Sequence, residues 1–70
     1  MKDLAVKFGM KLREMRKRNG ISQDKLALIA DIDRSYVGRI ERGEVNITLE
    51  KVYSLAHALK CDVNELLPAA

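Results

Sequence analysis

The chain has 70 residues, of which 47% are hydrophobic and 33% are charged, and its formal net charge is +3. This length permits one small domain around one hydrophobic core, so we expect residues 1–70 to form a single domain. One cysteine and one histidine exclude an internal disulfide and a zinc finger, and the lack of a long apolar run or a signal-peptide core predicts a soluble, cytoplasmic protein without a membrane partner.

The first expected helix covers residues 3–19 and carries most of the basic charge. Its apolar residues recur at spacings of four and three, which places them on one buried stripe: Leu4, Phe8, Leu12 and Met15. Residues 1–20 hold seven basic and two acidic side chains, a balance of +5, so the remaining fifty residues sum to −2. Such clustering suits a polyanionic partner, although lysine-rich surface helices also serve solubility.

Two short helices are expected next, at residues 23–30 and 34–42. Ser22 and Asp33 have the side chains that cap a helix N-terminus, and Asn19-Gly20 and Gly43 favour helix ends. The first of the two helices turns four residues toward the core: Leu26, Ala27, Ile29 and Ala30.

Residues 23–42 have the spacing of a helix-turn-helix unit. Ala27 is small enough to let the helices approach, Asp31 occupies the turn, and Val37 and Ile40 face inward on the second helix. That helix then presents a polar row to solvent: Arg34, Ser35, Tyr36, Arg39 and Arg42. In a helix-turn-helix unit this exposed face reads the edges of DNA bases.

The rest of the chain predicts one more helix and a last short helical turn. Thr48 caps a helix over residues 49–60, whose apolar face consists of Leu49, Val52, Leu55, Ala56 and Leu59. The last turn opens at Asp62 or Val63 and is closed by Pro68. We expect Leu66 to pack inward while Val63 and Leu67 contribute to a dimer contact. The period of every segment predicts an all-α bundle of five helices.

An ordered set of residues resembles the Xre type of lambda-repressor/Cro-like regulators over about residues 7–67. The set is Leu12-x-x-x-Arg16, Gly20-Ile21-Ser22-Gln23, Leu26-Ala27, Ile40-Glu41-x-Gly43 and Leu55-Ala56-x-x-Leu59. The resemblance implies a five-helix bundle of bacterial or phage type, associated with the nucleoid, that binds an operator in double-stranded DNA as a two-fold homodimer. Asp33-Arg34-Ser35-Tyr36 is similar to the controller proteins of restriction–modification systems, although prophage regulators are equally short.

The resemblance also implies roles for individual residues. Arg34, Ser35 and Arg39 match base-reading positions, and arginine can bond bidentately to guanine. Positions that match DNA-backbone contacts are Gln23, Tyr36, Arg42, Asn46 and Thr48. Arg16 and Glu41 match a partly buried structural ion pair. Asp31 departs from the glycine that is common at this turn, and Gly38 either lets the helix approach DNA closely or avoids a clash.

We therefore expect a transcriptional regulator that binds a pseudo-palindromic operator through the major groove. The alternative is a protein-interaction module, such as an antitoxin or adaptor, that uses the same bundle. An enzyme is a more distant possibility, because His57 and Cys61 have no partner at catalytic or metal-binding spacing. We expect no cofactor, metal or small-molecule ligand.

Overall fold

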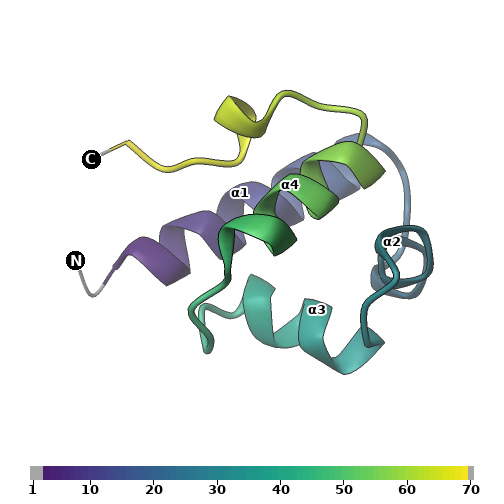
Figure 1. The fold of residues 1–70 in the computed structure, drawn as a ribbon, viewed down its shortest axis with the longest axis horizontal. Helices are drawn as coiled ribbons and strands as arrows, with labels where there is room; N and C mark the ends of the chain where they lie inside the picture. Colours follow the sequence, from purple (N-terminus) through teal and green to yellow (C-terminus); the bar gives the residue numbers. More distant parts are fainter. Residues whose placement is uncertain (1–2, 70) are drawn as a thin grey trace.

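A computed structural model describes residues 3–69 of the chain. Within that range the chain forms four α-helices and one 3-10 helix (Figure 1). In order they are α1 (Leu4–Arg18), α2 (Gln23–Ala30), α3 (Arg34–Glu41), α4 (Leu49–Ala58) and the 3-10 helix η1 (Val63–Glu65). The prediction of an all-α helix-turn-helix bundle is confirmed, whereas the count of five α-helices is corrected to four.

Side-chain caps start three of the α-helices where the sequence predicts them. The hydroxyl of Ser22 accepts a hydrogen bond from the backbone N–H of Lys25 at 3.0 Å. Asp33 accepts one from the N–H of Ser35 at 3.1 Å, and Thr48 accepts one from the N–H of Lys51 at 3.2 Å. Each cap satisfies a backbone donor that the helix itself cannot pair.

Each α-helix is followed, within two residues of its last residue, by a residue in the left-handed conformation. Gly20 and Gly43 have φ of 66° and 74°, while Asp31 and Lys60 have φ of 58° and 54°. After α2, the N–H of Ile32 bonds to the carbonyl of Ala27 at 3.0 Å, which closes the helix end. The helix-turn-helix turn therefore forms with aspartate in place of glycine, and aspartate tolerates this conformation better than most residues.

The core lies between the helices and includes Leu66 from the segment after η1. α1 packs against α3, α2 packs against α3 and α4, and η1 covers α4 (Figure 1). The buried apolar residues are Phe8, Leu12, Leu26, Ala27, Val37, Ile40, Val52, Leu55, Ala56, Ala58, Leu59 and Leu66. The inward placement predicted for Leu66 is confirmed, since its exposure is 0%.

Three apolar residues that we expected in the core are exposed instead. Leu4 and Leu49 are the first residues of α1 and α4, where the helices extend beyond the core, and Leu49 is 74% exposed. Ile29 is exposed because the two-turn helix α2 buries only Leu26 and Ala27 completely. Helical periodicity thus identified the correct face but overestimated how far the core extends along it.

The last two elements are shorter than predicted. α4 ends at Ala58, because Lys60 already has the left-handed conformation. The last turn is a three-residue 3-10 helix, which Asp62 and Glu65 close with a reciprocal capping box. Among the described residues, no helix is long and apolar enough to cross a membrane.

Candidate nucleic-acid interface

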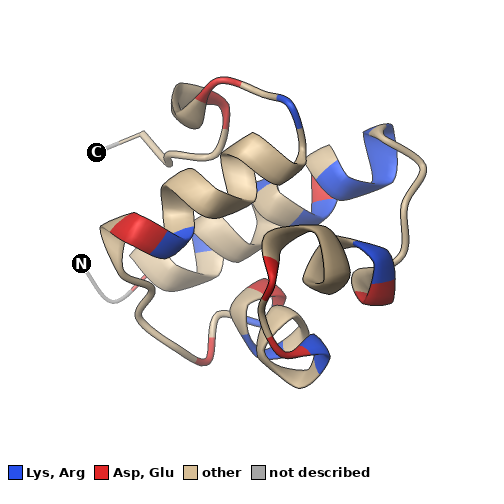
Figure 2. Cartoon of the chain, turned by 45° about the vertical axis from the view of Figure 1, so that its right-hand side comes forward, with Lys and Arg blue, Asp and Glu red and all other residues tan. Residues whose placement is uncertain are grey.

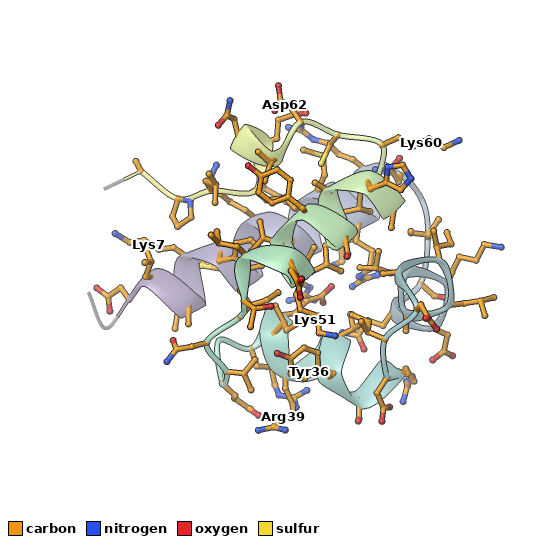
Figure 3. The ribbon with its side chains drawn as sticks, in the orientation of Figure 1. Lys7, Tyr36, Arg39, Lys51, Lys60 and Asp62 are labelled. Carbon is orange, nitrogen blue, oxygen red and sulfur yellow. The ribbon has the colours of Figure 1, made fainter. Side chains whose placement is uncertain are left out.

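The polar row predicted on α3 divides into an exposed part and a half-buried part. Arg34, Ser35, Arg39 and Arg42 are exposed, whereas Tyr36 is half-buried against the core. Arg39 and Tyr36 lie at the lower edge of the molecule as drawn in Figure 3. The row therefore forms one continuous solvent-facing surface on a helix whose opposite face is buried.

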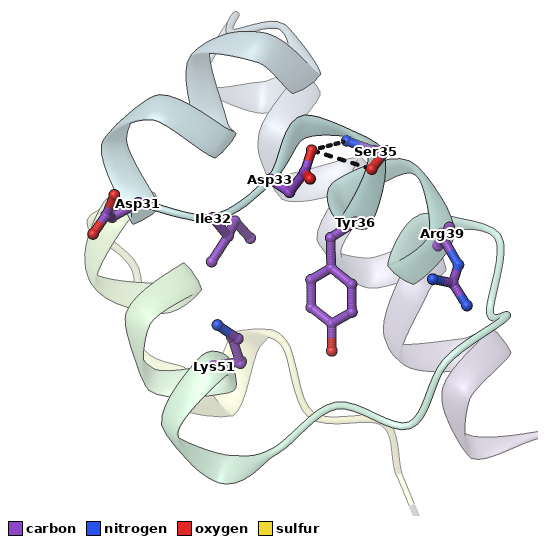
Figure 4. A pocket seen from close by; sticks show the side chains of 7 residues that line it. All are labelled: Asp31, Ile32, Asp33, Ser35, Tyr36, Arg39 and Lys51. Carbon is purple, nitrogen blue, oxygen red and sulfur yellow. Dashed lines mark hydrogen bonds between the residues drawn. The ribbon is translucent and has the colours of Figure 1, made fainter.

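The side of α3 that faces α4 borders a shallow hollow of about 430 Å³ (Figure 4). The ring of Tyr36 faces Lys51 of α4, whose Nζ lies 5.9 Å from the ring centroid. The hydroxyl and N–H of Ser35 both donate to Asp33 Oδ1 at 3.1 Å. Lys51 adds a positive charge to this surface that the sequence pattern did not indicate.

A nearly buried polar cluster fixes α3 relative to α1 and α2. Arg16 Nε donates to Glu41 Oε2 at 2.6 Å and Arg16 Nη2 to Glu41 Oε1 at 3.1 Å, and Arg16 Nη1 donates to the carbonyl of Ile21 at 2.9 Å. The two side chains are only 11% and 4% exposed. Gln23 Nε2 also donates to Glu41 Oε1, at 2.9 Å. The cluster determines the orientation in which α3 presents its outer face.

Two backbone N–H groups at the start of α2 form no hydrogen bond in the described part of the chain. Ser22 accepts from the N–H of Lys25, and no hydrogen bond among residues 3–69 uses the N–H groups of Gln23 or Asp24. Such free donors at a helix N-terminus can bind a phosphate. The side chain of Gln23, which we expected on the DNA backbone, is folded onto α3 through its bond to Glu41.

Two of the three exposed arginines of this surface are paired with carboxylates. Arg34 Nε contacts Asp24 Oδ1, and Arg42 Nε donates to Glu44 Oε2 at 2.7 Å. The hydrogen bond from Arg42 lowers the pKa of the Glu44 carboxyl, and the same bond raises the pKa of Arg42. Arg39 takes part in no ion pair found in the described part of the chain.

A family model described as Helix-turn-helix, HTH_3, matches residues 12–66, nearly the whole of the bundle. The chain belongs to this family. Family membership identifies it as a DNA-binding transcription regulator and not an enzyme.

Members of the helix-turn-helix family that resemble this chain include control proteins. Control protein C.BamHI of Bacillus amyloliquefaciens is 35% identical over 66 residues, which cover 93% of this chain and 82% of the relative. Control protein C.MunI of Mycoplasma sp is 34% identical over 67 residues, which cover 94% of this chain and 90% of the relative. The crystal structure of the restriction-modification controller protein C.AhdI from Aeromonas hydrophila is similar, with a TM-score of 0.88 and 48% identity over 90% of this chain and 96% of that one.

Other predicted site residues of this helix-turn-helix protein lie away from α3. Asn46 is exposed and borders an apolar groove of about 340 Å³ that is also lined by Leu4, Leu49 and Leu67. Thr48 is exposed, and its hydroxyl caps α4. Leu67 is 43% exposed, whereas Val63 is half-buried against the core. The groove therefore gathers apolar residues from both ends of the chain, a grouping that no local sequence pattern indicates.

Gly38 faces two side chains of the same surface. A Cβ added there would lie 3.1 Å from Arg42 Nη1 and 3.7 Å from Gln23 Oε1. The glycine therefore leaves room for the Arg42 guanidinium to lie across α3.

Two other side chains, those of His57 and Cys61, carry reactive groups. His57 is exposed, and Cys61 is half-buried. Burial raises the pKa of the Cys61 thiol, and the carboxylates of Glu65 and Asp62 raise it further. No cluster of potential metal ligands occurs among the residues that the structure describes.

Proposed function

We propose that the chain binds a pseudo-palindromic operator in duplex DNA as a homodimer and inserts α3 into the major groove. The observation that carries this proposal is the exposed face of α3, with Arg34, Ser35 and Arg39 on one side of a helix whose other side is buried. The Arg16–Glu41 pair fixes the far end of that helix. A rigid helix with exposed polar side chains is what direct reading of base edges requires.

Base reading is assigned to the three residues nearest the outer face of α3. Arg39 and Arg34 each carry terminal N–H groups that suit the O6 and N7 atoms of guanine. Ser35 carries a hydroxyl, which can donate to or accept from a base edge. Arg39 forms no ion pair in the described part of the chain, so of these two arginines it is the one without a carboxylate partner.

Backbone contacts surround this reading surface. The free N–H groups of Gln23 and Asp24 suit one phosphate, and the half-buried Tyr36 carries its hydroxyl toward the side of Lys51. The other assigned backbone contacts are Arg42, Asn46 and Thr48, all of which are exposed. These contacts would set the register of α3 without distinguishing sequences.

The dimer contact is assigned to the apolar groove at the N-terminal ends of α1 and α4. Leu67 lies there with Leu4 and Leu49, and all three side chains are at least 40% exposed. Val63 contributes less area because it already packs against the core. A two-fold contact would separate the reading helices by about 34 Å, one turn of the DNA helix.

Selection from random-sequence duplexes with the purified protein tests the proposal. We expect enrichment of sites that contain two related half-sites in inverted orientation. Equal, weak affinity for every duplex would overturn the assignment, and would favour the protein-interaction role instead.

Replacement of Arg39 tests the base-reading assignment within the selected operator. Arg39→Ala should weaken operator binding by about 1–3 kcal/mol and relax the preference at one base position. Arg13→Ala, which removes the same charge from the exposed surface of α1, is the matched control and should leave every base preference unchanged. Retained preference in Arg39→Ala would show that Arg39 does not read a base.

A further inference from the structure

Arg34 carries its own carboxylate partner at the outer surface of the helix-turn-helix unit. Its Nε contacts Asp24 Oδ1, and the two side chains are 67% and 69% exposed. Arg34 is the first residue of α3 and Asp24 lies in the first turn of α2, so the contact joins the starts of the two helices. Neither residue is needed as a cap, because Ser22 and Asp33 fill the two N-cap positions.

The carboxylate lies against Nε of the guanidinium. No hydrogen bond found within residues 3–69 involves Nη1 or Nη2 of Arg34. A guanine base is recognised by two parallel N–H groups of an arginine. A carboxylate at Nε restricts the rotation of the guanidinium, so less conformational freedom is lost when the terminal nitrogens meet a base.

The same carboxylate acts on the sequence-independent part of DNA binding. Attraction between arginine and phosphate is the same for every sequence, and it supplies most non-specific affinity. Asp24 stands at the start of α2, beside the free N–H groups that suit a phosphate. Its negative charge opposes a phosphate there unless Arg34 compensates it. The pair therefore reduces non-specific attraction while the reading edge of Arg34 stays open.

We propose that Asp24 is a positioning residue that orients Arg34 toward a guanine and lowers the affinity of the protein for unrelated DNA. Asp24 itself touches no base in this proposal, and the effect on specificity passes through Arg34. The inference rests on the proposed function, because it requires that α3 reads base edges.

The test compares four proteins and one control variant on three duplexes. Wild type, Asp24→Asn, Arg34→Ala and the double variant are titrated against the selected operator, against the operator altered at the base pair where Arg34→Ala loses preference, and against an unrelated duplex. Glu14→Gln is the matched control, because it removes one negative charge from the exposed surface of α1. Unfolding by urea shows whether each variant is folded.

Asp24→Asn should bind the unrelated duplex about two- to fivefold more tightly, as expected for an exposed ion pair. Its discrimination between the operator and the altered operator should fall by about five- to tenfold. In the Arg34→Ala background, Asp24→Asn should cause no further loss of discrimination, which a merely structural role would not explain. Glu14→Gln should leave discrimination unchanged.

Unchanged discrimination in a folded Asp24→Asn protein, or an equal change in Glu14→Gln, would overturn the inference. Loss of discrimination by Asp24→Asn in the absence of Arg34 would also overturn it, because the effect would not pass through Arg34. If wild type itself shows no preference for any duplex, the proposed function fails, and this result is distinct from the other three.

Discussion

Two charged side chains with little exposure join α1 to the end of α3, and Gln23 adds a third polar group from α2. Arg16 and Glu41 share two hydrogen bonds, and Gln23 and the carbonyl of Ile21 satisfy further polar groups of the pair. In the described part of the chain, no buried side-chain nitrogen or oxygen lacks a hydrogen-bond partner. The pair is tolerated because each charge is neutralised, so the loss of either member should be costly.

Replacement of Glu41 tests this argument. Glu41→Ala should lower the free energy of unfolding by about 3–5 kcal/mol, because Arg16 would remain nearly buried without a counter-charge. Urea unfolding measures this difference. The control is Glu44→Ala, which removes an exposed partner of Arg42 and should cost no more than about 1 kcal/mol. Equal losses in the two variants would show that the Arg16–Glu41 pair adds nothing beyond a surface contact.

At the level of single residues, the sequence was informative where a side chain has a fixed position along a helix. The exposed placement of Arg34, Ser35 and Arg39 and the pairing of Arg16 with Glu41 are present in the structure. The carboxylate partners Asp24 and Glu44 were missed. Exposed ion pairs follow no periodic pattern, and the Asp24 contact exists only because the turn brings the starts of α2 and α3 together.

At the level of elements, caps and glycines predicted helix boundaries better than apolar periodicity predicted burial. Ser22, Asp33 and Thr48 start helices because their side chains accept bonds from otherwise unpaired backbone donors. Burial depends instead on where neighbouring helices end, which one segment cannot reveal. Leu49 continues the apolar face of α4 yet is exposed, because none of the described elements covers the start of that helix.

The two glycines inside helices should respond in opposite ways to alanine. At Gly9 an added Cβ would lie 2.7 Å from the backbone oxygen of Glu41, so α1 and α3 would have to separate. Gly9→Ala should therefore lower the free energy of unfolding by about 1–3 kcal/mol. At Gly38 the nearest atom is the end of the exposed Arg42 side chain, which can move. Gly38→Ala should raise the free energy of unfolding by about 0.5–1 kcal/mol.

Thermal or urea unfolding of the two variants shows whether each substitution raises or lowers the free energy of unfolding. Circular dichroism of the folded proteins is the control, since both variants should keep the helix content of wild type. Destabilisation by Gly38→Ala comparable to that by Gly9→Ala would show that Arg42 is held rigidly across α3. In that case Gly38 would be required by the packing of the reading surface itself.

On the scale of the whole molecule, charge and apolar surface lie in different places. The C-terminal half of α1 is largely basic, whereas α2 and α3 carry both acidic and basic residues (Figure 2). Total charge therefore does not identify the reading surface, because the paired arginines on α3 are partly compensated by Asp24 and Glu44. The apolar groove lies between the start of α1, the start of α4 and the C-terminal segment. Base reading and self-association thus use separate surfaces in our proposal, although Asn46, a proposed contact to the DNA backbone, also borders the groove.

Two leucines of nearly equal exposure, one inside the apolar groove and one outside it, allow a controlled test of the self-association surface. Leu49 is 74% exposed and lines the apolar groove, while Leu28 is 75% exposed on α2, outside that groove. Leu49→Ser should weaken the dimer, because an apolar side chain that becomes buried only on association would be lost. Sedimentation over a range of concentrations should then show more monomer for Leu49→Ser than for wild type or Leu28→Ser.

Binding of Leu49→Ser to a single half-site should remain unchanged, because each protomer keeps its own α3. Greater dissociation in Leu28→Ser than in Leu49→Ser would move the interface to α2.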